Sequence, residues 1–356
     1  MSEATPAVGR RSATLEDVAR EAGVSRATVS RVVNGVRNVD PAIQEAVRRA
    51  VASTGYTPNS AARSLVTRRP DPVRRAATVA LVVTGAGEDS PEGPGAAVFT
   101  DPFFGRVVSG VFAALRPHGM HPVLMLADTP ASREQVVSYL HGGGADGALV
   151  VTTHAEDALP AALLASGRPA VLFGAPDAAL PLSYVDLANR DGARLAADHL
   201  AARGCRRVVT IAGPSGVQAG RDRLAGFRDA MARHGHPFTP AVEADFTHAG
   251  GERAMARLLA EEPELDGVFA ANDLMARGAL AVLAEHGRRV PEDVAVVGFD
   301  DSSAALSGRP LLTTVRQPVE RMAEEMTRIL LTRLADPAAR PTCVIFEPEL
   351  VVRQSA

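Results

Sequence analysis

Polar side chains follow several strand-like apolar runs in the second part of the chain. Asn272 comes directly after the run 268–271, Asp300 follows the run 296–299, and Arg223 lies a few residues after a Gly-Pro-Ser turn. Open α/β sheets bind their ligands beyond the carboxyl ends of the strands. We therefore expect these side chains to converge on one small polar ligand.

Aromatic residues accompany these polar groups. Asp101 and Phe103 belong to an Asp-Pro-Phe-Phe segment that precedes a predicted helix. Carboxylate, amide and guanidinium groups beside aromatic rings match a sugar, whose hydroxyls donate and accept hydrogen bonds while its ring faces are apolar. Each residue taken alone could equally form a turn, a helix cap or an ion pair. Only their convergence would make a site, and the ligand it predicts is a sugar.

A second kind of chemistry is indicated near the N-terminus, in a short segment that follows Ser25. If this segment is helical, valines form one face and a polar, arginine-bearing set forms the other: Arg26, Ala27, Ser30, Arg31 and Asn34. Arginine can pair with guanine in the major groove of DNA, and a helix N-terminus attracts phosphate. The alternative is that both arginines only solvate an exposed face.

The sequence lacks the motifs of nucleotide-binding proteins, serine hydrolases and zinc proteases. The chain has no P-loop, no G-x-S-x-G and no H-E-x-x-H, and the G-x-G-x-x-G at 142–147 precedes a strand instead of following one. We therefore predict no enzyme activity, no cofactor and no metal site.

Cys205 and Cys343 form no disulfide framework and are expected to be thiols in a reducing cytosol. No apolar run is long enough to span a membrane, and the N-terminus lacks an apolar signal region.

The elements that would position the arginine-bearing face are short helices. Thr14 and Asp17 match a capping box, and Gly23 ends the helix that they begin. Ser25 can cap the second helix, and Asp40, followed by proline, opens a third that runs to about residue 55. Two short helices joined by a glycine turn predict a helix-turn-helix.

The elements that would position the sugar-binding residues alternate between strands and helices. The predicted strands are 78–83, 123–126, 147–151, 170–173, 207–211, 267–270 and 294–298. The predicted helices are 105–115, 134–141, 192–203, 224–234, 250–259, 274–286 and 321–334. This alternation predicts parallel sheets covered by helices, and about 280 residues are enough for two lobes.

Charge is distributed unevenly along the 356 residues. Residues 1–75 contain 13 arginines and 7 acidic residues, a net of +6, whereas the remainder has 25 arginines and 34 acidic residues, a net of −9. This charge distribution, with a basic N-terminal part and an acidic remainder, predicts that the N-terminal part binds a polyanion.

Two segments of the basic part resemble the headpiece of the lactose-repressor/galactose-repressor (LacI/GalR) family: TLEDVAREAGVSRATVSRVVNG at 14–35 and GYTPNSAARSL at 55–65. The resemblance implies that Arg26 and Ala27 select the operator sequence, that Arg31 contacts a base or the backbone, and that Ser25, Thr28 and Asn34 hold phosphates. The predicted DNA-binding set is Thr14, Ser25, Arg26, Ala27, Thr28, Ser30, Arg31, Asn34, Asn59 and Leu65.

The family also has a hinge helix, which here falls at 59–66. This segment is too short to be a stable helix by itself, and in the family it folds on DNA. The leucine at the position of Leu65 enters the minor groove, where an apolar wedge can kink the duplex. The arginine- and proline-rich residues 67–75 are typical of a linker.

Motifs of the acidic part resemble the effector domain of the same family. They include DPFF at 101–104, ANRDGARL at 188–195, AGRDRLAGF at 219–227, FAANDLMARGAL at 269–280, VVGFDD at 296–301 and TTVRQP at 313–318. The resemblance implies that the effector is bound by Asp101, Phe103, Asp191, Arg223, Phe246, Asn272, Asp300 and Gln317. The long loop 84–100 and the segment 173–189 depart from the family pattern.

We therefore predict an all-α helix-turn-helix headpiece (1–66), a linker (67–75) and a two-lobed, periplasmic-binding-protein-like α/β domain (76–356) that binds effector and dimerises. The predicted function is a cytoplasmic repressor that binds a near-palindromic operator in double-stranded DNA as a homodimer and is controlled by a sugar. Two other functions share part of this pattern: an exported sugar-binding protein and a sugar-processing enzyme.

Overall fold

The chain divides into two units, Met1–Arg75 and Ala76–Ala356. The computed structural model describes residues 14–33, 39–54, 78–84, 100–151, 154, 157–176 and 179–356. The predicted hinge helix, the linker, most of the loop 84–100 and the residues Asn34, Asn59 and Leu65 lie outside this described part.

The first unit contains three helices within its described residues, α1 (Leu15–Ala22), α2 (Arg26–Val33) and α3 (Pro41–Thr54). Thr14 and Asp17 form the capping box at the start of α1, and Gly23 ends this helix in the left-handed conformation with φ of 66°. Val18, Val29 and Val47, one from each helix, are buried together. The predicted helix-turn-helix and third helix are thus present.

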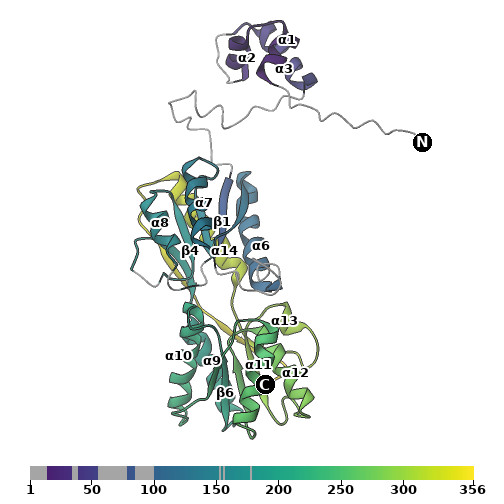
Figure 1. The fold of residues 1–356 in the computed structure, drawn as a ribbon, viewed down its shortest axis with the longest axis vertical. Helices are drawn as coiled ribbons and strands as arrows, with labels where there is room; N and C mark the ends of the chain where they lie inside the picture. Colours follow the sequence, from purple (N-terminus) through teal and green to yellow (C-terminus); the bar gives the residue numbers. More distant parts are fainter. Residues whose placement is uncertain are drawn as a thin grey trace, which may run out of the picture. The chain divides into compact units, whose positions relative to one another are not determined.

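The second unit contains two lobes (Figure 1). The described residues of lobe 1 are those within 78–187 and 319–346, and they contain a parallel sheet in the order β11-β5-β4-β3-β1-β2. The strands are β1 (Thr78–Val83), β2 (His121–Leu126), β3 (Ala148–Val151), β4 (Ala170–Phe173), β5 (Ser183–Leu187) and β11 (Cys343–Phe346). The helices are α6 (Pro102–Leu115), η1 (Arg116–His118), α7 (Pro130–His141), α8 (Leu159–Ala165) and α14 (Val319–Ala335).

Lobe 2 comprises residues 188–318 and 347–356, and its sheet has the order β12-β10-β9-β8-β6-β7, with β12 antiparallel to β10. The strands are β6 (Val208–Ala212), β7 (Ala241–Glu243), β8 (Gly267–Ala270), β9 (Ala295–Asp300), β10 (Thr313–Arg316) and β12 (Glu349–Val351). The helices are α9 (Asn189–Ala202), α10 (Gln218–Arg233), α11 (His248–Glu261), α12 (Asp273–Glu285) and α13 (Ser303–Leu306).

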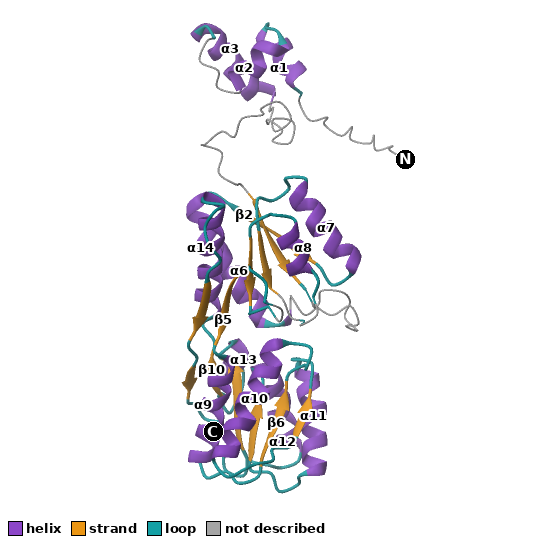
Figure 2. Cartoon of the chain, turned by 90° about the vertical axis from the view of Figure 1, so that its left-hand side faces the viewer, coloured by secondary structure: helices purple, strands orange, loops and turns teal. Residues whose placement is uncertain are grey.

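Alternation along the strands places helices on both faces of each sheet (Figure 2). In β1, Leu81 packs on the side of α6 and α14, while Val82 packs on the side of α7 and α8. In β8, Phe269 packs toward α9 and α10, and Val268 packs toward α11 and α12. Strands buried on both faces read as continuous apolar runs, which is why the sequence predicts these strands well. The predicted α/β class with parallel sheets is confirmed.

The chain passes between the lobes three times, at residues 187–189, 316–319 and 346–349. Each passage starts at the end of a strand, β5, β10 or β11. Polar residues at these strand ends therefore lie where the two lobes meet. Within the described part of the chain, no helix is both long and apolar enough to cross a membrane.

Candidate functional site

Helix α2 presents an exposed polar face in the first unit. Ser25–Ala27 and Arg31 are exposed, while Val29 on the opposite side is buried. The Ser25 hydroxyl accepts a hydrogen bond from the backbone N–H of Thr28 at 3.1 Å, so it caps the helix as predicted. A capped helix with such a face can lie in the major groove with its first residues against base edges.

Arg26 is held only weakly in this unit. Its Nη1 lies 3.5 Å from Oε1 of Glu16, and the two side chains are 69% and 67% exposed. Exposed ion pairs contribute little to stability, so Arg26 can exchange this partner for a base at small cost. Thr14, by contrast, uses its hydroxyl in the capping box with Asp17.

Arg223, on α10, is the centre of a buried polar cluster in the second unit. Its Nε donates to Oδ1 of Asn189 at 2.9 Å, and its Nη2 donates to Oε1 of Gln317 at 3.1 Å. Its Nη1 donates to the carbonyl oxygen of Ala271 at 2.7 Å and to Oδ1 of Asp300 at 3.3 Å. One guanidinium group on α10 thus contacts the start of α9, the end of β9 and the residues that directly follow β8 and β10.

An aromatic ring fixes the plane of this guanidinium group. The Cζ atom of Arg223 lies 3.7 Å from the centroid of the Phe299 ring, a cation–π contact. Phe299 itself is completely buried in β9. Since the ring covers one face and hydrogen bonds hold the edge of the group, Arg223 is a rigid part of the cluster.

Asp300, the last residue of β9, is the acidic residue of the cluster that contacts Arg223 directly. Asp300 is buried, and its backbone has a φ of 109°, a value that residues other than glycine rarely adopt. Burial raises the pKa of Asp300 to about 8, although Arg223 opposes this shift. The neighbouring carboxyl groups of Asp273 and Asp101 contribute to this raised pKa.

Lobe 1 contributes Asp101 and Phe103 to the same region. Asp101 caps α6, accepting a hydrogen bond from the backbone N–H of Phe103 at 2.9 Å. Burial raises the pKa of the Asp101 carboxyl group. This group also interacts electrostatically with Arg223 and Asp300 in lobe 2. The Phe103 ring packs edge-on against Phe104 and Phe173, with centroids 5.3 Å apart in each pair. Asp101 thus adds an acidic group from lobe 1 to the cluster, and Phe103, two residues later in the chain, packs in an aromatic group.

Asn272 and Phe246 lie together in lobe 2. Asn272 caps α12 by accepting from the backbone N–H of Met275, and its Nδ2 donates to the carbonyl oxygen of Phe246 at 2.9 Å. Phe246 has φ of 63°, and its ring lies where a side chain at position 213 would be, so only Gly213 fits there. Asn272 therefore fixes the turn that presents the Phe246 ring.

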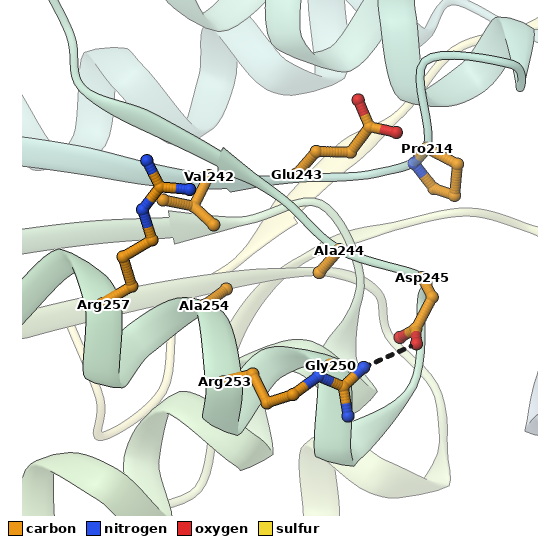
Figure 3. Close-up of a pocket in the computed structure, with 9 residues that line it drawn as sticks. All are labelled: Pro214, Val242, Glu243, Ala244, Asp245, Gly250, Arg253, Ala254 and Arg257. Atoms are coloured by element: carbon orange, nitrogen blue, oxygen red, sulfur yellow. Dashed lines mark hydrogen bonds and ion pairs between the residues drawn. The ribbon is translucent and has the colours of Figure 1, made fainter.

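The same turn forms one wall of a pocket of about 390 Å³ between β7 and α11 (Figure 3). Arg253 and Arg257 extend from α11 along this pocket. Arg253 donates to Oδ2 of Asp245 at 2.9 Å, and Arg257 donates to Oε1 of Glu261 at 2.7 Å. Both arginines already have acidic partners. We therefore infer that the residues lining this pocket stabilise the turn that leads to Phe246.

Comparison with known proteins matches both units. Residues 14–59 match the family model of bacterial regulatory proteins of the lacI family, and residues 197–356 match that of a periplasmic binding protein-like domain. The HTH-type transcriptional regulator CelR of Thermobifida fusca is 44% identical over 351 residues, which cover 97% of this chain and 99% of that protein. The chain belongs to the LacI family.

Solved structures of LacI-family regulators share this architecture. A complex of the transcriptional regulator CelR with cellobiose is 41% identical with a TM-score of 0.73, and the match covers 97% of this chain and 100% of that one. The lac repressor dimer bound to operator and the anti-inducer ONPF is 26% identical with a TM-score of 0.79, covering 97% and 99%. The family and fold predicted from the sequence are thus confirmed, and the chain is a transcriptional regulator.

The structure brings most of the predicted effector residues of this LacI-family chain together, but not Asp191. The Asp191 side chain is 57% exposed, and its carboxylate lies 3.4 Å from Arg194 on the outside of α9. Asn189, two residues earlier, is buried in its place and accepts from Arg223. Successive helical residues are rotated by about 100°, so residues 189 and 191 point in widely different directions.

Sequence reasoning missed two further members of the cluster, Asp186 and Phe299. Asp186, in β5, accepts from the backbone N–H groups of Ala175 and Leu187, and burial raises the pKa of its carboxyl group. Both residues lie at or near the carboxyl end of a strand, which is the signal that could have found them. Among the described residues, no group of three or more His, Cys, Asp or Glu side chains could hold a metal ion.

The buried carboxyl groups predict how stability depends on pH. The pKa values of Asp300 and Asp273 are raised by burial to about 8 and about 7 from the ordinary 3.8. Above about pH 5 the unfolded chain has released these protons, while the folded chain retains them until the pH passes about 7 for Asp273 and about 8 for Asp300, so stability falls as pH rises over this range. Carboxyl groups with lowered pKa, such as Asp293, are ionised in both states over this range.

We therefore expect the melting temperature to fall from pH 5 to pH 8, by roughly 2–4 °C for each kcal/mol of stability lost in a domain of this size. Calorimetry of the wild-type chain and of Asp300→Asn in matched buffers checks this. The variant, which cannot ionise at residue 300, should have a flatter profile. An equally steep fall in both proteins would show that Asp300 does not titrate in this range.

Proposed function

We propose that this LacI-family regulator is a sugar-controlled repressor that binds its operator as a homodimer in the cytoplasm. The observation that carries the proposal is the buried cluster around Arg223, which gathers polar groups from distant parts of the chain at the meeting of the two lobes. The headpiece supplies the operator contacts, and the cluster supplies the response to effector.

The DNA contacts are assigned to the exposed face of α2. Arg26 and Ala27 at its N-terminus read bases, Arg31 contacts a base or the backbone, and the hydroxyls of Ser25 and Thr28, 2.9 Å apart, face phosphates. One helix-turn-helix reads only a half-site, so two chains on a near-palindromic operator double the contact. The related lac repressor structure, a dimer on its operator, supports this assignment.

The charge of the cluster favours an uncharged effector. Asp300 is a buried acid and Asp101 and Asp186 are half-buried acids, whereas Arg223 already donates to four protein oxygens. A phosphorylated ligand would add negative charge beside these acids, and Arg223, the cation that contacts Asp300, already has protein partners for its guanidinium group. A neutral sugar instead offers hydroxyls that can donate to the carboxylates. Because the related CelR is known in complex with cellobiose, cellobiose is the first sugar to test.

Control of DNA binding is assigned to the hinge at 59–66. The effector changes the arrangement of the two lobes, and the unit that begins at residue 76 passes the change through the linker to the hinge. The alternative function, an exported sugar-binding protein, would not require a DNA-binding headpiece. The match of residues 14–59 to the lacI family model therefore argues against that alternative.

The test of DNA reading uses Arg26→Ala. Fluorescence anisotropy with the region upstream of the protein's own gene identifies the operator, and every single base-pair change in it is then measured for both proteins. We expect Arg26→Ala to lose about 1–3 kcal/mol on the best operator and to become indifferent at one base pair, because a side chain that pairs with a base edge is removed. A uniform loss on all sequences would make Arg26 a phosphate contact. No preference for any sequence in the wild type would overturn the proposed function.

A further inference from the structure

Arg106, on α6 of lobe 1, reaches into lobe 2 beside the cluster. Its Nη1 donates to the backbone carbonyl oxygen of Asp300 at 2.9 Å, and its Nη2 donates to that of Gln317, also at 2.9 Å. Asp300 ends β9 and Gln317 follows β10, and the side chains of both contact Arg223. One guanidinium group thus holds the backbone of two residues whose side chains form the proposed effector site.

Glu320 orients this guanidinium group. Nε of Arg106 donates to Oε1 of Glu320 at 2.7 Å, and Nη2 donates to Oε2 at 2.8 Å, a bidentate pair between α6 and the first turn of α14. The Arg106 side chain is only 18% exposed. The fork of hydrogen bonds requires a planar guanidinium group, which a lysine cannot reproduce.

The backbone that Arg106 holds is strained. Asp300 and Asp301 have φ of 109° and 50°, and such conformations persist only when the surrounding structure enforces them. Within lobe 2, the carboxylate of Asp301 is held by Arg316 and Arg353. Arg106 adds the constraint from lobe 1, on the carbonyl oxygen of Asp300 itself.

We propose that Arg106 is a positioning residue of the effector site, which fixes the turns after β9 and β10 so that Asp300 and Gln317 face the sugar. It acts through the backbone and need not touch the ligand. Since its two carbonyl acceptors, at Asp300 and Gln317, lie in the other lobe, these hydrogen bonds also tie lobe 1 to the part of lobe 2 that binds effector. This inference rests on the proposed function for its sugar readout, but not for its effect on the turns.

The first experiment measures the turns without any sugar. Hydrogen exchange of the full chain is followed in peptides that cover 300–304 and 316–320. We expect faster exchange in both segments for Arg106→Gln and a smaller increase for Arg106→Lys, which keeps the charge but loses the fork. Arg328→Gln is the matched control, because Arg328 forms an exposed pair with Glu325 on α14. Unchanged exchange in Arg106→Gln would overturn the proposal.

The second experiment measures cellobiose binding to the same proteins by calorimetry. We expect affinity to fall about 10- to 100-fold in Arg106→Gln, to fall less in Arg106→Lys and to stay within about twofold in Arg328→Gln. Operator affinity without sugar should be unchanged, because α1–α3 have their own core. A cooperative thermal unfolding transition shows whether the 76–356 unit of each variant is folded. Unchanged sugar affinity in Arg106→Gln, or an equal loss in Arg328→Gln, would overturn the positioning role. If the wild type binds no cellobiose, the choice of effector fails, and hydrogen exchange alone decides whether Arg106 fixes the turns.

Discussion

Arg223→Ala is expected to abolish the response to sugar and to lower the free energy of unfolding of the 76–356 unit by about 3–5 kcal/mol. The Arg223 and Asp300 side chains are 6% and 10% exposed, so truncating one leaves the other without its partner and almost without water. Oδ1 of Asn189, Oε1 of Gln317 and the carbonyl oxygen of Ala271 lose a donor at the same time. The Phe299 ring also loses the group that covers it.

Calorimetry and operator binding of the full chain measure this effect. Arg228→Ala, on the exposed side of the same helix, is the control and should change stability by less than about 0.5 kcal/mol. Operator affinity without sugar should survive in both variants, because α1–α3 have their own core. A sugar response that persists in Arg223→Ala would place the effector site elsewhere in the chain.

A double-mutant cycle separates the charge pair from the rest of the cluster. If burial of the unpaired Asp300 dominates the loss, adding Asp300→Asn to Arg223→Ala should recover part of the stability but none of the sugar binding. The two single losses would then sum to more than the loss of the double variant. Strict additivity would show that the 3.3 Å contact between Arg223 and Asp300 contributes nothing of its own.

Arg223 also shows where sequence reasoning ends. The sequence predicts that the helix in this region begins at Leu224, because the apolar periodicity starts there. In the structure, α10 begins at Gln218 and so includes Arg223. Val217, the residue before the helix, makes no side-chain cap, so the usual signal for a helix start is missing. The residue type was sufficient to predict a ligand contact, but its place inside a helix depends on tertiary contacts to Asn189 and Gln317.

The strands differ for a related reason. Buried runs such as β4 and β8 were predicted to the residue, because every side chain in them is apolar. β7 and β12 have only three residues each, and β5 alternates between buried and half-buried positions beside a proline-rich segment. Their pairing is decided by neighbouring strands far away in the sequence. For this reason the sequence did not indicate that Asp186 and Asn189 join the cluster around Arg223.

The coupling between sugar and operator provides the second large effect. We expect a saturating effector to weaken operator affinity by roughly 5- to 150-fold, the usual range of coupling between two sites. The direction follows from the proposed repressor function, in which the sugar favours an arrangement of the lobes that does not let the hinge at 59–66 fold on DNA. A ligand can shift this equilibrium only by its different affinities for the two arrangements.

Two measurements must agree if this coupling exists. Operator affinity is measured by anisotropy with and without cellobiose, and cellobiose affinity is measured by calorimetry with and without saturating operator, all at one salt concentration because phosphate contacts are salt-dependent. Linkage requires the same factor in both directions. Leu65→Ala should reduce operator affinity and DNA bending, since the proposed minor-groove wedge is removed, while leaving cellobiose affinity without DNA unchanged. Equal sugar affinity with and without operator would remove the coupling, because no rearrangement of the hinge could then connect the Arg223 cluster to the operator.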